Sequence, residues 1–84
     1  MYKIVMVLLL LSSFVFGEVD INTATFDELV SLKGIGKKKA KRILKYRKKH
    51  KCFKNAKEFK KVKGITKKII KKNKDELVIS ECKK

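Results

Sequence analysis

The chain has 84 residues and carries 24 Lys and Arg against 8 Asp and Glu, which gives a formal net charge of +16. This length fits one small domain and leaves no room for a separate catalytic domain beside it. The charge requires an acidic partner, and nucleic acid, anionic lipid and acidic polysaccharide all meet that requirement.

The first 17 residues differ from the rest of the chain. A short basic start is followed by an unbroken apolar run from Ile4 to Leu11, and Val15 and Gly17 are the small residues of a cleavage site. We therefore expect residues 1–17 to be a signal peptide and the protein to be periplasmic or secreted. The apolar stretch is shorter than the roughly 20 residues that span a bilayer. An uncleaved segment that anchors the protein to the membrane is one alternative, and a buried N-terminal helix is another.

Residues 18–84 are expected to form one all-α domain, beginning with a helix from Phe26 to Leu32. Thr25 precedes that helix and is followed three residues later by Glu28, the arrangement of a capping box. After a tight turn, a second helix is predicted from Lys37 to about Lys49. Its apolar residues form one narrow stripe at spacings of three and four, and Lys and Arg occupy nearly all other positions. The stripe consists of Ala40, Ile43 and Leu44.

The chain then repeats itself at an offset of 30 residues. Residues 32–38 read Leu-Lys-Gly-Ile-Gly-Lys-Lys, and residues 62–68 read Val-Lys-Gly-Ile-Thr-Lys-Lys. The match extends upstream, where Asn55 and Glu58 form a second N-cap signature in the same register. Caps, turns and apolar positions that recur in one register indicate a structural repeat rather than a lysine-rich composition.

The second copy predicts a helix from Ala56 to Lys61, a turn at 63–66 and a helix from Lys67 to about Glu76. The segment Leu77–Ile79 is expected to close the core as an extended or helical tail, and no β-strand pattern competes with the helices. We expect apolar residues of both copies to be buried together, namely Ile21, Leu29, Leu32, Ile35, Ala40, Ile43, Leu44, Phe53, Phe59, Val62, Ile65, Ile69 and Leu77.

The string from Leu32 to Ala40, with Ile43 after it, resembles the helix-hairpin-helix signature hGhGxxxA. The opening Val19-Asp20-Ile21-Asn22-Thr23-Ala24 is similar to the INTA start of the ComEA-type DNA receptors of natural transformation. The resemblance covers residues 19–79 and implies a tandem helix-hairpin-helix domain of four short helices. It also implies an exported competence protein that binds double-stranded DNA without sequence preference and delivers it to DNA-uptake channel proteins.

Phosphate binding is expected at the first turn. Gly34 and Gly36 permit positive φ and remove side chains, so that backbone N–H groups can approach a phosphate while Ile35 plugs the core. The start of the following helix adds free amides and a positive dipole end. The alternative is an ordinary helical corner in which glycine only ends a helix. The predicted DNA-binding residues of this hairpin are Lys33, Gly34, Ile35, Gly36, Lys37, Lys38 and Lys39.

The second hairpin departs from the signature at two positions. Thr66 stands where glycine is expected, and Ile70 stands where a small residue is expected. Thr66 can still cap the next helix, so a weaker phosphate contact and a purely structural role both stay open. We therefore expect the first turn to dominate DNA binding. The predicted residues of the second hairpin are Lys63, Gly64, Ile65, Thr66, Lys67 and Lys68.

The chain has two cysteines, Cys52 and Cys82, and an even count in an exported protein predicts a disulfide. A zinc site that includes His50 is a weak alternative, because three ligands without CxxC or HxxxH spacing make a poor metal signature. No metal, cofactor or small-molecule substrate is predicted.

No enzymatic activity is predicted. Asp75 and Glu76 are adjacent and so face different directions on a helix, and the single histidine completes no catalytic set. Two other functions stay open: a cationic secreted protein that binds membranes or acidic polysaccharide, and a DNA-binding or repair accessory module without a role in uptake. A membrane-active helix needs a broad apolar face, whereas the apolar stripe here is narrow.

Overall fold

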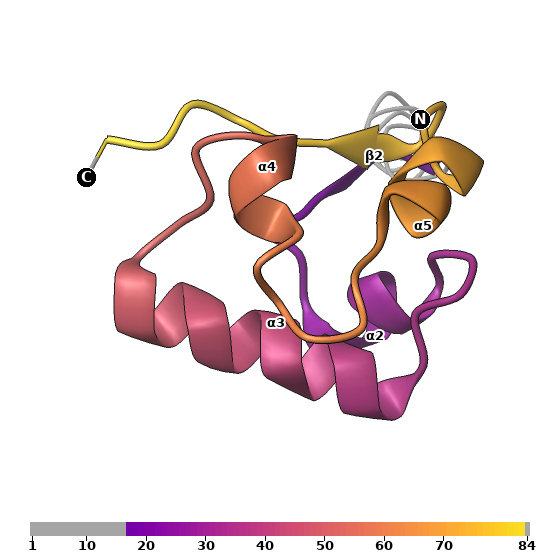
Figure 1. Ribbon diagram of the computed structural model, residues 1–84, viewed down its shortest axis with the longest axis horizontal. Coiled ribbons are helices and arrows are strands. Elements are labelled where there is room, and N and C mark those ends of the chain that lie inside the picture. The colour runs from indigo at the N-terminus through magenta and orange to yellow at the C-terminus, as the bar shows by residue number, and fades with distance from the viewer. Residues whose placement is uncertain (1–16, 84) are drawn as a thin grey trace, which may run out of the picture.

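The computed structural model describes residues 17–83, so the predicted signal peptide lies outside the described residues except for Gly17. The elements in chain order are β1 (Val19–Asp20), α2 (Phe26–Val30), α3 (Lys37–His50), α4 (Ala56–Phe59), α5 (Lys67–Lys72) and β2 (Leu77–Val78). The predicted fold of four helices in two helix-turn-helix units is confirmed (Figure 1). Within 17–83, no helix is long and apolar enough to cross a membrane.

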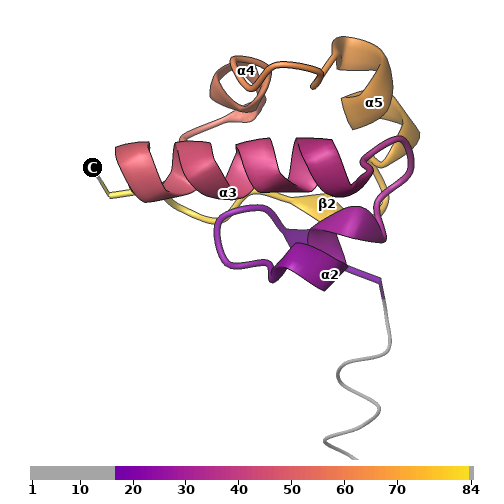
Figure 2. The ribbon, with the colours of Figure 1, turned by 90° about the horizontal axis from the view of Figure 1, so that it is seen from below.

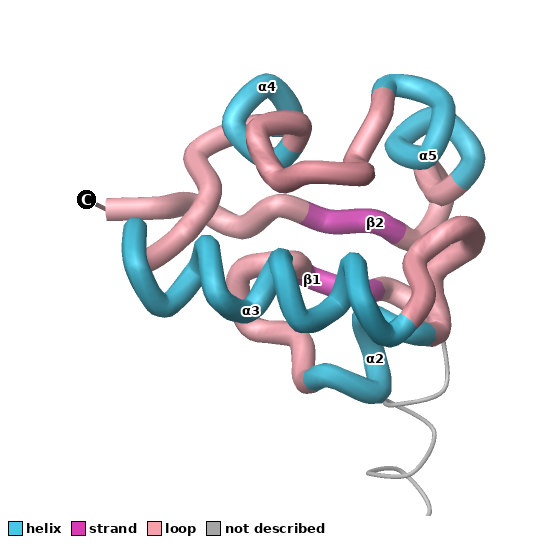
Figure 3. The backbone as a smooth tube through the Cα atoms, turned by 60° about the horizontal axis from the view of Figure 1, so that its bottom comes forward, coloured by secondary structure: helices cyan, strands magenta, loops and turns pink. Residues whose placement is uncertain are grey.

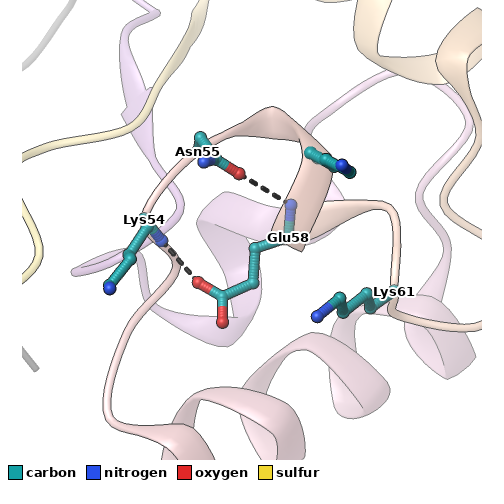
Figure 4. Close-up of a pocket in the computed structure, with 5 residues that line it drawn as sticks. Lys54, Asn55, Glu58 and Lys61 are labelled. Carbon is teal, nitrogen blue, oxygen red and sulfur yellow. Dashed lines mark hydrogen bonds between the residues drawn. The ribbon is translucent and has the colours of Figure 1, made fainter.

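The predicted N-cap residues start the first helix of each hairpin. At α2, the Thr25 hydroxyl accepts from the Glu28 N–H at 3.2 Å and the Glu28 carboxylate accepts from the Thr25 N–H at 2.8 Å, a complete capping box. At α4, the Asn55 side chain accepts from the Glu58 N–H at 2.9 Å. The Glu58 carboxylate accepts instead from the N–H of Lys54 at 2.7 Å, one residue before the cap (Figure 4).

Three helices end earlier than predicted, α2 at Val30, α4 at Phe59 and α5 at Lys72. The end of α5 has a clear physical cause in Asn73. Its side-chain amide turns back to donate to the Ile69 carbonyl at 2.8 Å and also reaches the first hairpin. Asparagine side chains that bond to the backbone in this way compete with helix continuation.

Apolar residues of both hairpins form one core, as predicted. Leu44 and Leu77 are only partly buried, whereas Val19 and Ala24 join the core unpredicted. Asn73 is 1 % exposed, and the residues described leave no buried side-chain polar atom without a hydrogen bond. The buried apolar residues are Val19, Ile21, Ala24, Leu29, Leu32, Ile35, Ala40, Ile43, Phe53, Phe59, Val62, Ile65 and Ile69.

Two short strands join the hairpins. β1 and β2 are parallel, with Val19 opposite Leu77 and Asp20 opposite Val78. The sequence predicted no strand, and that prediction is wrong for these two-residue segments. The extended alternative predicted for residues 77–79 is confirmed at Leu77–Val78. Figure 3 shows the pair lying between α2 and α3 on one side and α4 and α5 on the other.

The opening segment is fastened beside the disulfide. Cys52 and Cys82 are paired as predicted, with their Cα atoms 5.7 Å apart. The Asn22 amide donates to the carbonyls of Phe53 and Ser80, both at 2.9 Å, and accepts from the Phe53 N–H at 2.7 Å. The asparagine of the opening motif therefore ties the chain start to the inter-hairpin loop and to the tail.

Candidate nucleic-acid interface

The turns at 33–36 and 63–66 have the same backbone shape. Gly34 has a φ of 79° and Gly64 a φ of 96°, in the left-handed region that favours glycine. In each turn the isoleucine N–H donates to the carbonyl three residues before it, at 3.1 Å in the first turn and 3.0 Å in the second. The internal repeat of the sequence is therefore a repeat of turn geometry as well.

Gly36 does not adopt the positive φ that the sequence predicted. Its φ is −89° and its ψ is −172°, and an added Cβ would meet no atom within 4 Å. Thr66 occupies the equivalent position with φ −115° and ψ 165°, and its hydroxyl accepts from the Ile69 N–H at 3.2 Å. Both residues are N-caps, a position that is extended in most helices. Threonine therefore adds a cap to the second hairpin without changing the turn.

Both turns offer backbone N–H groups to a ligand. Those of Gly34 and Gly36, and those of Gly64 and Thr66, find no acceptor within residues 17–83. The first amides of α3 have no intrahelical acceptor either. Ile35 and Ile65, the middle residues of the turns, are buried, so their side chains anchor the turns to the core. Clustered N–H groups of this kind form a concavity that binds anions.

Each turn packs on the second helix of the other hairpin. A Cβ at Gly34 would lie 3.3 Å from Cγ1 of Ile69 on α5, and a Cβ at Gly64 would lie 3.0 Å from Cε of Lys39 on α3. Ile69 and Lys39 are separated by the repeat offset, so the two contacts are equivalent. A pseudo-two-fold axis therefore relates the hairpins and brings the two turns next to each other.

Side chains from the same helices hold the turns in place. The Asn73 amide accepts from the Lys33 N–H and donates to the Lys33 carbonyl, both at 2.8 Å. In the second turn, Nη1 of Arg42 donates to the Lys63 carbonyl at 3.3 Å. Each turn thus has its first residue bound by a side chain of the opposite hairpin, which fixes the turn before any ligand arrives.

The predicted lysines flank the turns, and Lys39 differs from the others in its burial and contacts. Lys39 is half-buried, because its stem packs against Gly64 and its ammonium donates to the Gly34 carbonyl at 3.1 Å. An ammonium has three donors, so Lys39 retains two for a ligand between the turns. The other predicted lysines are exposed: Lys33, Lys37, Lys38, Lys63, Lys67 and Lys68.

A second basic surface was not predicted. It is a shallow, open groove with a volume of about 250 Å³ between α3 and the residues that enter the second turn. The spacing of Arg42, Lys45 and Lys49 on one face of α3 was the available signal, but the high lysine content of the whole helix hid it. Lys61 and Lys63 line the opposite wall.

Tyr46 connects this cavity to α4. Its ring stacks between His50 and Phe53, with centroid distances of 4.1 and 4.7 Å, and its hydroxyl donates to the Glu58 carboxylate at 3.0 Å. Burial, followed by the hydrogen bond and the negative charge of Glu58, raises the pKa of the Tyr46 phenol above its ordinary value of 10.0.

The disulfide argues against the alternative of a zinc site that includes His50 and the two cysteines. Both cysteines are consumed in the bridge, so neither is a free thiolate ligand. Among residues 17–83, no group of three or more His, Cys, Asp or Glu side chains is placed to hold a metal ion.

Comparison with known proteins identifies a family over most of the chain. A family model described as the helix-hairpin-helix motif matches residues 16–78. A protein of Haemophilus influenzae (strain ATCC 51907 / DSM 11121 / KW20 / Rd), named only as an uncharacterized protein, is 47% identical over 62 residues. That match covers 73% of this chain and 55% of the relative, so the chain spans about half the length of the curated relative it matches.

Proposed function

This chain belongs to the helix-hairpin-helix family, and we propose that it binds the phosphate backbone of double-stranded DNA without preference for base sequence. Family membership supports nucleic-acid binding in general. The observation that carries the finer proposal is the pair of equivalent, adjacent turns, each with unpaired N–H groups and exposed lysines. Two such sites suit a ligand with two phosphate strands.

Each turn would hold one phosphate group. Oxygens of the first phosphate accept from the N–H groups of Gly34 and Gly36 and from the first amides of α3, whose opening turn contains no acidic residue. Oxygens of the second accept from Gly64 and Thr66. With the turns side by side, the two phosphates belong to opposite strands across one minor groove. Contacts of this type carry no base information, so binding is independent of sequence.

We also propose that the protein is exported and acts as a DNA receptor for uptake in natural transformation. The pattern of residues 1–17 supports export, and the Cys52–Cys82 disulfide supports an oxidising compartment such as the periplasm. The opening 19–24 and the tandem hairpins support a ComEA-type role, in which the protein captures duplex DNA for uptake-channel proteins. The proposed activity is binding and not catalysis.

Charge-matched variants test the turn-based mechanism. Lys37→Gln combined with Lys67→Gln removes one lysine beside each turn, and Lys57→Gln combined with Lys74→Gln removes the same charge elsewhere. The turn variant should lose about two units of the log–log slope of affinity against salt, roughly 0.9 per phosphate contact. Equal losses in both variants would assign binding to diffuse lysine charge.

The competing functions and the uptake role need separate measurements. Binding to duplex DNA, to anionic vesicles and to an acidic polysaccharide is compared at matched salt, and duplex DNA should bind most tightly. Tighter binding to vesicles or polysaccharide would favour a cationic secreted protein of another kind. Deleting the gene should abolish transformation by added DNA, whereas unchanged transformation would refute the uptake role.

A further inference from the structure

A groove runs along α3 from the second turn toward the end of the helix. It is the shallow, open groove of about 250 Å³ described above. Arg42, Lys45 and Lys49 form its α3 wall, since residues three and four apart share one helix face. Lys61 and Lys63 form the opposite wall.

Hydrogen bonds and ring contacts hold the groove in shape. The bond from Arg42 to the Lys63 carbonyl, at 3.3 Å, closes the end nearest the second turn. Val62 lines the groove and is 4 % exposed. Tyr46 also lines it, with its ring parallel to that of Phe53 within 9° and its hydroxyl held on α4. The groove therefore has a fixed floor beneath exposed, positively charged side chains.

The groove is strongly cationic and contains no counter-charge of its own. None of its lining residues is acidic. Glu58 lines a neighbouring cavity beside α4 that shares Lys61 with the groove, and Figure 4 shows its carboxylate directed toward the Lys54 N–H. A concave surface lined by one sign of charge concentrates ligands of the opposite sign. A chain of regularly spaced phosphates fits such a groove better than a single small anion does.

We propose that this groove binds the sugar-phosphate backbone of the same duplex beyond the two turns, and so lengthens the footprint of the protein on DNA. The inference rests on the proposed function. The two sites are continuous, because Lys63 belongs to both the turn and the groove and Arg42 joins them. Figures 1 and 2 show α3 starting at the first turn and running past the second.

The dimensions of the groove agree with this role. From Arg42 to Lys49, α3 rises by about 10 Å at 1.5 Å per residue. Phosphates follow each other at about 3.4 Å of axial rise along one strand, so an α3 laid parallel to the duplex axis would pass about three of them. The groove therefore adds contacts only when the duplex extends past the turns.

Duplex length separates the groove from the turns. Lys45→Gln combined with Lys49→Gln removes two of the three positive charges of the α3 wall, and Lys48→Gln combined with Lys74→Gln is the matched control outside the groove. Affinity is measured against salt for a hairpin-closed duplex of about 4 base pairs, about 14 Å long, and for one of about 20 base pairs. Thermal unfolding first establishes that both variants fold like the parent.

On the longer duplex, the groove variant should bind at least about fivefold more weakly than the control and lose about two units of log–log slope. On the short duplex the two variants should bind alike. The inference would be overturned if the groove variant and its control lost equal affinity for the longer duplex. It would also be overturned if the groove variant lost the same affinity for both duplexes. Either result would leave the proposed function standing. If the parent bound neither duplex, the proposed function itself would fail.

Discussion

At the scale of single residues, Gly34 and Gly64 determine the shape of the turns. Their φ values of 79° and 96° are costly for any residue with a Cβ. A Cβ would also lie 3.3 Å from Ile69 at position 34 and 3.0 Å from Lys39 at position 64. We expect Gly34→Ala and Gly64→Ala each to lower the free energy of unfolding by about 1–2 kcal/mol, the usual cost of the left-handed conformation. Urea denaturation measures this change.

Gly36→Thr is the matched control for those two variants. Gly36 has a negative φ and open space around it, and threonine already occupies the equivalent position 66. We expect its stability to be unchanged or raised by a few tenths of a kcal/mol, because threonine caps a helix at least as well as glycine. A loss as large as that of Gly34→Ala would show that the N-cap assignment of Gly36 is wrong.

Asn73 links α5 to the first turn through buried hydrogen bonds. Asn73→Leu removes both bonds to Lys33, so we expect a loss of about 1–3 kcal/mol in unfolding free energy. Hydrogen exchange at the Lys33 amide should accelerate. Asn55→Ala, which removes an exposed cap of α4, should leave that exchange rate unchanged. Similar acceleration in both variants would mean that Asn73 acts only through global stability.

At the scale of secondary-structure elements, the bond from Tyr46 to Glu58 joins α3 to α4. The raised pKa of Tyr46 means that folding favours the protonated phenol. The resulting stability is fully present below pH 10.0 and is lost as the pH rises through the higher pKa of the folded state. Glu58→Gln should lower the Tyr46 pKa toward its ordinary value. Burial of the ring should still keep that pKa above 10.0.

An alkaline ultraviolet titration measures this pKa. In a chain that begins at Glu18, Tyr46 is the only tyrosine, so the signal is unambiguous. The parent should titrate above pH 10.0 and the Glu58→Gln variant at a lower pH than the parent. If Tyr46 of the parent titrated at its ordinary pKa, the hydrogen bond from Tyr46 to Glu58 that joins α3 to α4 would be contradicted.

The disulfide ties the loop between the hairpins to the tail. Cys52 and Cys82 are 30 residues apart, and closing such a loop stabilises the native state by about 3–4 kcal/mol on the chain-entropy model. Reduction should therefore lower the melting temperature by more than about 10 °C. Mass measurement before and after reduction counts the thiols. Two free thiols in protein purified without reductant, or an unchanged melting temperature, would contradict this expectation.

At the scale of the whole molecule, the sequence predicted what repeats locally. Caps, turns and apolar spacing lie within a few residues of one another, so the helix starts and the buried Ile35 and Ile65 were predictable. Contacts between segments distant in the sequence could not be predicted in this way. The pairing of Val19 with Leu77 involves strands too short to show alternation, and the role of Asn73 depends on Lys33, 40 residues away.

The two predicted turns are present with the same backbone geometry, whereas the basic groove beyond them was not predicted. A glycine-rich string does not reveal which glycine has positive φ, so Gly36 was assigned a positive φ that only Gly34 has in that turn. The basic groove was missed because lysine is abundant on every exposed face of α3. Its walls come together only when the second turn packs on that helix, as the contact between Gly64 and Lys39 shows.

The protein is proposed to bind the phosphates of DNA, and not its bases, through a defined set of groups. Equilibrium affinity for a panel of random-sequence duplexes, measured across a range of salt concentrations, tests it most directly. Four to six neutralised phosphates predict a log–log slope of about −4 to −5, the same for every duplex. A shallow slope, or a strong preference for some duplexes over others, would contradict the account.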